Sequence, residues 1–480
     1  MAQSHKQVRP VSLRLLLVPV VVGLFFLATL AGYLTNNDSP PAAAPPTASS
    51  PPLTVQTSRA DPPDGAELIA APKEEGPAAE VDPVVSYKQA IALLDANYYG
   101  APLDNKKTRQ LTYEAIRGML TSLHDQFTTF LDPSEWSQMQ ALTKGDFEGI
   151  GAYLDQKSGG FVRIVRPIPT SSAEKAGLQS GDQIIGVNGH SVRGKEMGEV
   201  IHLIKGPLGA RIRLEILRGT HTLSVTVTRT RVEPPVVQHW MEDNQNRIGH
   251  IVLSEFNERS MEQLDSAFHD LERQKMKALV FDMRSNPGGL LDTAISVASI
   301  FVPSDSSDTA ALKRNVVILR EGGGQEKGLK LRPYEHTHGQ IPLVVLVNNN
   351  SASASEIVTG AIKDYGVGTI IGERTYGKGR VQTLIPMDDH SALRLTTQLY
   401  FPPRHGDINF RRDEQGMRIP GTGGIVPDIE VKQSAAWKEE NFRDKANDLQ
   451  LQTALCFLRA RLQKKTVAEA SDVVKKVSLH

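Results

Sequence analysis

The sequence predicts a multidomain α/β protein with a membrane-spanning helix at its N-terminus. Two patterns indicate this. Between about Val236 and Val431, short apolar runs of strand length alternate with segments of helical periodicity, the order typical of an α/β core. Near the N-terminus, the segment Leu15–Leu34 carries no charge. About twenty apolar residues in a helix span the roughly 30 Å hydrocarbon core of a membrane.

The residues around this apolar segment indicate its orientation. Lys6, Arg9 and Arg14 precede it, and the positive-inside rule places such a basic flank in the cytoplasm. We therefore expect a single-pass protein of a bacterial inner membrane with the bulk of its chain in the periplasm. Polar residues follow the segment directly, which favours an uncleaved signal anchor. The run Ala42–Ala44 leaves signal-peptide cleavage open, and cleavage would give a secreted periplasmic protein.

The remaining chain divides by composition. Residues 35–83 are rich in Pro, Ala, Ser and Thr, which is typical of an extended linker because such a stretch buries too little apolar surface to fold. Phe127–Leu131 and Asp132-Pro133 are expected to form a turn within a mostly helical stretch. The expected parts are a cytoplasmic tail and anchor at 1–34, the linker at 35–83, a helical region at 84–145, a small β-rich domain at 146–230, the core at 231–432 and a helical tail at 433–480.

Charge and cysteine content exclude some function classes. Lys and Arg together number 54, as do Asp and Glu, so no net field favours a nucleic-acid partner. Cys456 is the single cysteine, so an intrachain disulfide is excluded. It lies in the helical pattern Leu449–Leu462 and is expected to be a core residue.

Ser353 and Lys378 are the strongest candidates for catalysis. Ser353 stands between two alanines, where a small nucleophile could be exposed at the end of a strand. Lys378 lies between two glycines, which allow a tight turn that aims the amine inward. A lysine acts as a general base only when burial lowers its pKa from about 10.4 towards neutrality. Gln382, four residues further on, could orient the amine.

Each of these residues also has a simpler interpretation when taken alone. A serine in a Ser/Ala run commonly caps a helix. A Gly-Lys-Gly sequence is usually a solvated turn, and a lone glutamine is usually on the surface. The interpretation as a catalytic group rests on the three residues occurring together with the turn described next.

A second element of the candidate site is the turn Asn286-Pro287-Gly288-Gly289 after the apolar run Ala278–Asp282. It reads as the end of a buried strand followed by a helix. Two glycines at such a junction leave backbone N–H groups unobstructed. The N–H groups of Gly289 and Ala354 are therefore a candidate donor pair for an oxyanion. A packing turn is the alternative.

These segments resemble the carboxyl-terminal processing (tail-specific) proteases, a serine-lysine peptidase family, from about Val84 to Ala460. The resemblance rests on Asp282-Met-Arg-Ser-Asn-Pro-Gly-Gly289, Ser351-Ala-Ser-Ala-Ser-Glu356, Gly372-Glu-Arg-Thr-Tyr-Gly-Lys-Gly-Arg-Val-Gln382 and Gly424-Ile-Val-Pro-Asp428. It implies that Ser353 is the nucleophile, Lys378 the general base and Gln382 its orienting partner. Gly289 and Ala354 then supply the oxyanion N–H groups. Met283 departs from the Leu usual in the Asp-Leu-Arg motif, which affects no catalytic residue.

The β-rich segment 146–230 resembles a PDZ domain. It begins with the loop Gly149-Ile150-Gly151-Ala152, whose consecutive N–H groups could bind the C-terminal carboxylate of a peptide. A short helix near Ser172, a strand near Ile184 and a helix near Val200 follow in the PDZ order. The resemblance implies recognition of C-terminal tails, whereas a bulge is the alternative for the loop alone.

Two other patterns fail. Gly372–Gly379 resembles a phosphate-binding loop, but Gly379 occupies the position where Ser or Thr is needed. A strand pattern follows it, whereas a phosphate-binding loop leads into a helix. His336 and His338 have poor spacing for a metal, so a solvated loop is expected there. His390 is expected in a hairpin turn.

The sequence as a whole predicts a membrane-tethered serine endopeptidase that needs no metal or organic cofactor. Its expected partners are protein substrates with accessible C-terminal tails, cell-envelope proteins among them, and the membrane through the N-terminal helix. An activator or adaptor protein and a homo-oligomer remain open. The rival prediction is a non-catalytic PDZ adaptor. Lys205 is a candidate regulatory residue that bridges domains, with an exposed lysine at a helix C-terminus as the alternative.

Overall fold

The computed structural model describes residues 82–100, 103–156, 160–302, 314–332, 341–404, 406–434, 436–437 and 445–477. The predicted anchor Leu15–Leu34 and most of the predicted linker lie outside these residues, as do His336 and His338. No helix among the residues described has the length and apolarity needed to cross a membrane. The described chain falls into two compact units, one up to Met119 and the other from Leu120 onward.

The first unit is a pair of helices, α2 (Pro83–Asn97) and α3 (Asn105–Thr121), the latter reaching the boundary between the units. Asp82 caps α2 by accepting a hydrogen bond from the Val84 N–H, and Pro83 occupies the first helical position. The Tyr87 hydroxyl donates to Thr112 Oγ1 at 2.7 Å and joins the two helices. The predicted helical character of this region is confirmed.

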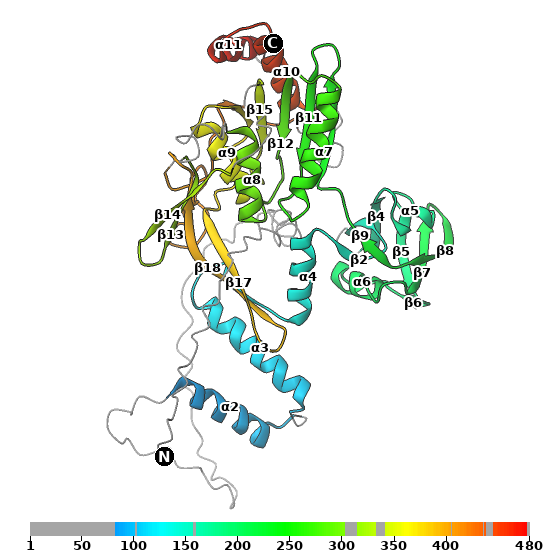
Figure 1. Ribbon diagram of the computed structural model, residues 1–480. Coiled ribbons are helices and arrows are strands. Elements are labelled where there is room, and N and C mark those ends of the chain that lie inside the picture. The colour runs from blue at the N-terminus through cyan, green and yellow to red at the C-terminus, as the bar shows by residue number, and fades with distance from the viewer. Residues whose placement is uncertain are drawn as a thin grey trace, which may run out of the picture. The chain divides into compact units, whose positions relative to one another are not determined.

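A six-stranded sheet forms the centre of the second unit (Figure 1). Its first two strands are antiparallel and the others are parallel. Its strands, in spatial order, are β10 (Val237–Asp243), β11 (Ile248–Leu253), β12 (Ala278–Asp282), β15 (Leu343–Val347), β16 (Thr369–Gly372) and β19 (Ile429–Glu430). The strand–helix alternation predicted from the sequence is therefore confirmed.

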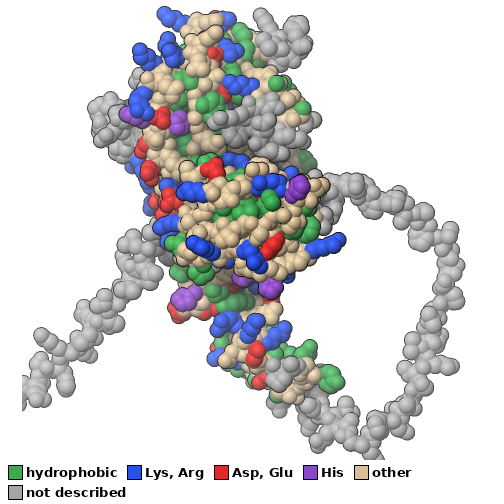
Figure 2. Space-filling model, turned by 90° about the vertical axis from the view of Figure 1, so that its right-hand side faces the viewer, with side chains coloured by type: hydrophobic (Ala, Val, Ile, Leu, Met, Phe, Trp, Pro, Cys, Tyr) green, Lys and Arg blue, Asp and Glu red, His purple; other side chains and the backbone are tan. Residues whose placement is uncertain are grey.

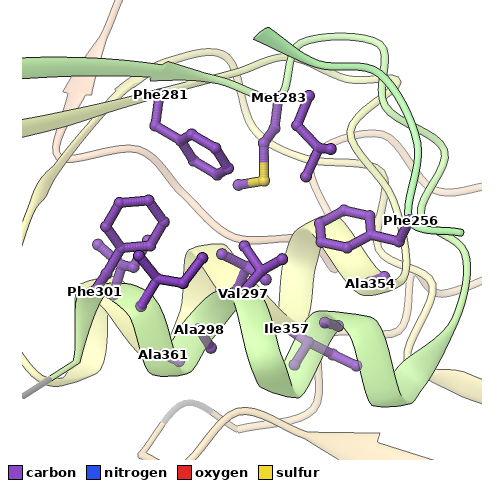
Figure 3. Packing of buried hydrophobic residues seen from close by; sticks show 14 of the residues in the cluster. Phe256, Phe281, Met283, Val297, Ala298, Phe301, Ala354, Ile357 and Ala361 are labelled. Carbon is purple, nitrogen blue, oxygen red and sulfur yellow. The ribbon is translucent and has the colours of Figure 1, made fainter. Parts of the chain in front are cut away.

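Helices cover both faces of this sheet. Successive residues of each strand point to opposite faces, so neighbouring apolar residues pack against different helices. Phe281 of β12 belongs to the apolar cluster with α7 (Ser260–Arg273), α8 (Leu291–Phe301) and α9 (Ala354–Asp364). Val280, its neighbour, belongs to the cluster with α10 (Leu449–Leu462) and α11 (Val467–Val477). Figure 3 shows Phe281 and Met283 pointing toward the residues of α8 and α9. Cys456 packs against the second cluster, as predicted.

A second sheet lies beside the core. It comprises β1 (Thr129–Leu131), β13 (Asn315–Glu321), β14 (Glu326–Lys330), β17 (Arg380–Pro386) and β18 (Ala392–Phe401). His390 has a φ of 66° in the turn between β17 and β18, as predicted for a hairpin. The prediction that Phe127–Leu131 forms only a turn is wrong, because Thr129–Leu131 pairs with Ala392–Arg394 as β1. Asp132 then caps α4 (Pro133–Lys144), with Pro133 at its start.

The segment 146–230 folds as a small β domain. Its main sheet comprises β3 (Ala152–Gln156), β4 (Val162–Pro167), β5 (Gln183–Val187), β6 (His190–Ser191), β7 (Arg211–Arg218) and β8 (His221–Thr228). Helices α5 (Ser172–Lys175) and α6 (Met197–Ile204) pack on its apolar core, and β2 (Phe147–Gly149) pairs with β9 (Thr230–Val232). Basic and acidic side chains are interspersed on the face shown in Figure 2.

Candidate active site

Ser353 lies between the end of β15 and the start of α9, as predicted for a nucleophile, but the prediction that it is exposed there is wrong, because the surrounding residues bury it completely. Its φ of 56° and ψ of −113° are rare for a residue with a side chain and cost about 1–3 kcal/mol. The surroundings hold this conformation, since the Tyr400 hydroxyl donates to the Ser353 carbonyl at 2.9 Å. Ser353 is fully buried, and its Oγ has no hydrogen-bond partner among the described residues. Ser353 is also the N-cap residue of α9, the simpler role considered above, but its side chain makes no capping hydrogen bond.

Lys378 lies in the loop between β16 and β17, and its side chain is only 7% exposed. Burial, and to a smaller extent the positive charge of Arg394, lower the pKa of its amine to about 7 against the opposing effect of Glu356 and Asp125. The Nζ atom lies 5.1 Å from the centroid of the Phe127 ring. At neutral pH a large fraction of this amine is therefore unprotonated and able to accept a proton.

Glu356 joins the backbone around these two residues, although sequence reasoning did not single it out. Its Oε2 accepts from the N–H groups of Ser353 and Lys378, at 2.9 Å each. Its Oε1 accepts from the Gly377 N–H and the Thr375 hydroxyl, at 2.6 Å each. Burial raises the pKa of this carboxyl, and the four donors counteract that rise. Its position three residues after Ser353, the Ser-x-x-Glu capping pattern, is the sequence signal that could have identified it.

The predicted oxyanion turn lies against the nucleophile. Gly289 has a φ of 146°, and a Cβ there would stand 2.0 Å from the Phe256 carbonyl oxygen. The Asn286 carbonyl accepts from the Ala352 N–H at 3.0 Å and the Ser355 hydroxyl at 2.8 Å, which fixes the turn against the start of α9. The N–H groups of Gly289 and Ala354 donate to none of the described residues. They are free to bind an oxyanion.

Gln382 lies on β17 in the same buried region. Its Nε2 donates to Thr396 Oγ1 at 3.4 Å, and its Oε1 is buried without a partner among the described residues. The oxygen is thus an available acceptor for an ammonium group, although the structure records no bond from Gln382 to Lys378.

A buried network of charged residues lies next to the turn that carries Gly289. Arg284 pairs with Asp282 and with Asp448, the residue that caps α10, at distances of 2.6 and 2.8 Å. His250 lies between Glu242 and Asp282, which hold its pKa above the ordinary value despite complete burial. The network ties β11, β12 and α10 together just ahead of the turn that carries Gly289.

The predicted peptide-binding loop is rigidly held. The Ile150 carbonyl accepts from the Ala173 N–H at 2.7 Å, and the Gly151 carbonyl accepts from the Ile168 N–H at 2.9 Å. Gly151 has a φ of 81°, and Ala152 begins β3. Lys205 is the residue that ends α6, where burial lowers the pKa of its amine. No described residue forms an ion pair with it, so bridging of domains by Lys205 stays a prediction.

No group of three or more His, Cys, Asp or Glu side chains within the described ranges could hold a metal ion. The combination of a buried serine, a buried lysine of lowered pKa and two free N–H groups fits acyl transfer.

Two parts of the chain match known protein families. Residues 247–431 match the model of peptidase family S41, and residues 163–218 match the PDZ domain. The carboxy-terminal-processing protease of Bartonella bacilliformis is 34% identical over 373 residues, which cover 74% of this chain and 78% of that protein. This chain belongs to the carboxy-terminal processing proteases.

Other relatives support the same assignment. The carboxyl-terminal-processing protease of Synechocystis sp. is 33% identical over 346 residues, covering 71% of this chain and 75% of the relative. The carboxy-terminal processing protease CtpA of Bacillus subtilis is 35% identical over 309 residues, covering 64% and 63%. This chain is therefore a serine-type peptidase with a PDZ domain and an α/β S41 core. The non-catalytic adaptor is thereby set aside as the main function.

Proposed function

We propose that this peptidase cleaves protein substrates selected through their C-terminal tails, by a Ser353–Lys378 mechanism, outside the cytoplasmic membrane of a bacterium. The observation that carries the mechanism is the burial of Lys378, which lowers the pKa of its amine to about 7 in a loop tied to Ser353 through Glu356. The PDZ domain supports the selection of tails.

In the proposed reaction, Ser353 Oγ attacks the scissile carbonyl while the Lys378 amine accepts the hydroxyl proton. The carbonyl oxygen becomes an oxyanion, and the N–H groups of Gly289 and Ala354 stabilise it. The protonated lysine then donates its proton to the leaving amine, which yields an acyl-enzyme. Water hydrolyses the ester in a second round of the same proton transfers. In this proposal Gln382 orients the ammonium form of the lysine, and its buried Oε1, which has no partner among the described residues, supports that role.

The mechanism is tested on the detergent-solubilised full chain with unfolded casein as substrate. Ser353→Ala and Lys378→Ala should each abolish cleavage. Lys378→Arg should not restore it, because a guanidinium stays protonated. The exposed Lys327 of β14 provides the matched control, and Lys327→Ala should keep wild-type activity. Cleavage by Lys378→Ala at the wild-type rate would refute the lysine base.

The membrane tether is proposed from the uncharged segment Leu15–Leu34 and its basic flank. The protein should sediment with membranes, stay there in high salt and be released by detergent. External protease should degrade it in spheroplasts but not in intact cells. A soluble mature protein that begins near Ala42–Thr47 would instead show that the segment is a cleaved signal peptide.

A further inference from the structure

The catalytic lysine is covered by residues far from it in sequence. Phe127 is 4% exposed, and its ring centroid lies 5.1 Å from Lys378 Nζ and 5.8 Å from the guanidinium carbon of Arg380. The sequence predicts Phe127 only as part of a turn. A ring in this place occupies space that water would otherwise take next to the amine, which matters because hydration of an ammonium strongly favours its protonated form.

Phe127 is held in place by β18. Arg394 Nε donates to the Phe127 carbonyl at 3.2 Å, and Arg394 pairs in register with Thr129 of β1. Asp125 accepts from the Phe127 N–H at 3.2 Å and from the Thr128 hydroxyl at 2.8 Å. Thr128 Oγ1 in turn accepts from the Thr396 N–H at 3.1 Å. The backbone around Phe127 is therefore bound on both sides.

Arg394 also acts electrostatically on Lys378. Burial lowers the pKa of its guanidinium. An arginine side chain nevertheless stays protonated in proteins at neutral pH. The charged groups that act on Lys378 are Arg394 from β18, Asp125 from the segment before β1, and Glu356 from α9. Arg380, on β17, contacts the same Phe127 ring and pairs with Asp125 at 3.4 Å. Of the three charged groups that act on Lys378, Arg394 is the one whose charge disfavours the ammonium form of the lysine.

We propose that Phe127 and Arg394 are positioning residues for the base: Phe127 excludes water from the Lys378 amine, and Arg394 both fixes Phe127 and repels the proton. The proposal rests on the function proposed above, since it takes Lys378 to be the general base. It assigns a catalytic purpose to the pairing of β1 with β18, which brings Phe127 to a lysine 251 positions later in the chain.

The ring has two opposing effects on the lysine. Exclusion of water favours the neutral amine, whereas the face of an aromatic ring attracts a cation. Replacing Phe127 by Leu separates the two, because Leu keeps apolar bulk and removes the aromatic face. If water exclusion dominates, Phe127→Ala should raise the pKa of Lys378, and Phe127→Leu should leave it close to the wild-type value or slightly lower.

The test is the pH dependence of kcat/KM of the full chain on a fluorogenic peptide, between pH 5.5 and 10. The wild-type acid limb should fall near pH 7. Phe127→Ala should shift it toward alkaline pH. A shift of about one pH unit lowers kcat/KM at pH 7 about five-fold and leaves the alkaline plateau intact. The buried Phe130 provides a matched control, and Phe130→Leu should leave the limb in place.

Arg394 is tested in the same assay. Arg394→Gln should shift the acid limb of the pH profile toward alkaline pH. Arg394→Lys keeps the positive charge, so its acid limb should lie close to the wild-type position. A structural role alone would lower kcat/KM equally at every pH and would not respond to charge. The melting temperature of each variant shows whether it folds. If Phe127→Ala or Arg394→Gln does not fold, the milder variants Phe127→Leu and Arg394→Lys still test the proposal.

The outcomes separate the two proposals. An acid limb that stays in place in both Phe127→Ala and Arg394→Gln, while Lys378→Ala is inactive, overturns the role of Phe127 and Arg394 alone. A limb that moves to lower pH in both Phe127→Ala and Phe127→Leu shows that the aromatic face dominates, and it overturns water exclusion. Wild-type cleavage by Lys378→Ala overturns the proposed mechanism itself.

Discussion

The backbone N–H groups of Ser353 and Lys378 donate to one and the same atom, Oε2 of Glu356, at 2.9 Å each. The proposed nucleophile and the proposed base are thus linked through one buried carboxylate rather than through their own side chains. Glu356 is also the third residue of α9. Because the helix fixes Glu356, it fixes the spacing of two loops that come from different strands of the sheet.

We expect Glu356→Gln to impair catalysis strongly. An amide has one oxygen in place of two and places an NH2 group among four donors, so at least one buried N–H or O–H loses its partner at a cost of about 1–3 kcal/mol. Casein cleavage should fall at least ten-fold while the circular dichroism spectrum stays native. Glu326→Gln on the exposed β14 serves as control. Wild-type turnover by Glu356→Gln would show that the shared carboxylate is dispensable.

Burial of Lys378 should lower the free energy of unfolding. Its pKa falls from 10.5 to about 7 on folding, so the unfolded chain binds more protons than the folded chain between these values. The free energy of unfolding contributed by this group therefore increases as pH rises from 7 to 10.5, and the full cost is present below pH 7. Each pKa unit corresponds to about 1.4 kcal/mol.

Lys378→Met should accordingly be more stable than the wild type at pH 6, by up to about 4–5 kcal/mol if the whole shift is realised. The gain should shrink as pH approaches 10. Chemical denaturation at several pH values measures it, with the exposed Lys327→Met as reference. A stability difference independent of pH would contradict the lowered pKa of Lys378.

The oxyanion turn should tolerate no side chain at Gly289. An added Cβ would stand 2.0 Å from the Phe256 carbonyl oxygen, and a φ of 146° is strained for any other residue. Gly289→Ala should therefore displace the turn and abolish cleavage of casein, with a lower melting temperature. Gly324→Ala, at a φ of 80° with open space around it, carries backbone strain without a clash and should remain active. Activity in Gly289→Ala would remove this N–H from the oxyanion site.

Local patterns were sufficient to predict the alternation of strands and helices in the core. Strand β12 has the bounds expected from its apolar run, Ala278–Asp282, and α9 lies in the region where helical periodicity was expected. Both elements are buried, and their periodicity alone identifies them. The turn at Gly288-Gly289 was equally visible, because glycines at a strand-to-helix junction are a strong local signal.

Contacts between distant segments could not be read in this way. The three-residue strand β1 exists because it pairs with β18, more than 260 residues later, so Phe127–Leu131 was interpreted as a turn. For the same reason neither Phe127 nor Arg394 could be connected with Lys378 from the sequence. Glu356 is different, since its Ser-x-x-Glu spacing was visible, but the two loops it joins become neighbours only in the folded chain.

The last prediction concerns the selection of tails by the PDZ loop. Gly151 has a φ of 81°, and an added Cβ would stand 2.4 Å from Ser171 Cβ. Gly151→Ala should therefore distort the loop whose N–H groups are proposed to bind a terminal carboxylate. The wild type should cleave a substrate with a free C-terminus at a lower KM than the same substrate with an amidated C-terminus.

In Gly151→Ala this difference should disappear, because the free tail loses its binding site while the catalytic residues remain intact. Gly219→Ala is the matched control, since Gly219 also has a positive φ, of 60°, in the same domain but no atom within reach of an added Cβ. Lys205→Ala, compared in parallel, should lower kcat on the tailed substrate alone if Lys205 couples tail binding to catalysis. Equal KM values for free and amidated tails in the wild type would show that the PDZ domain does not select the terminal carboxylate.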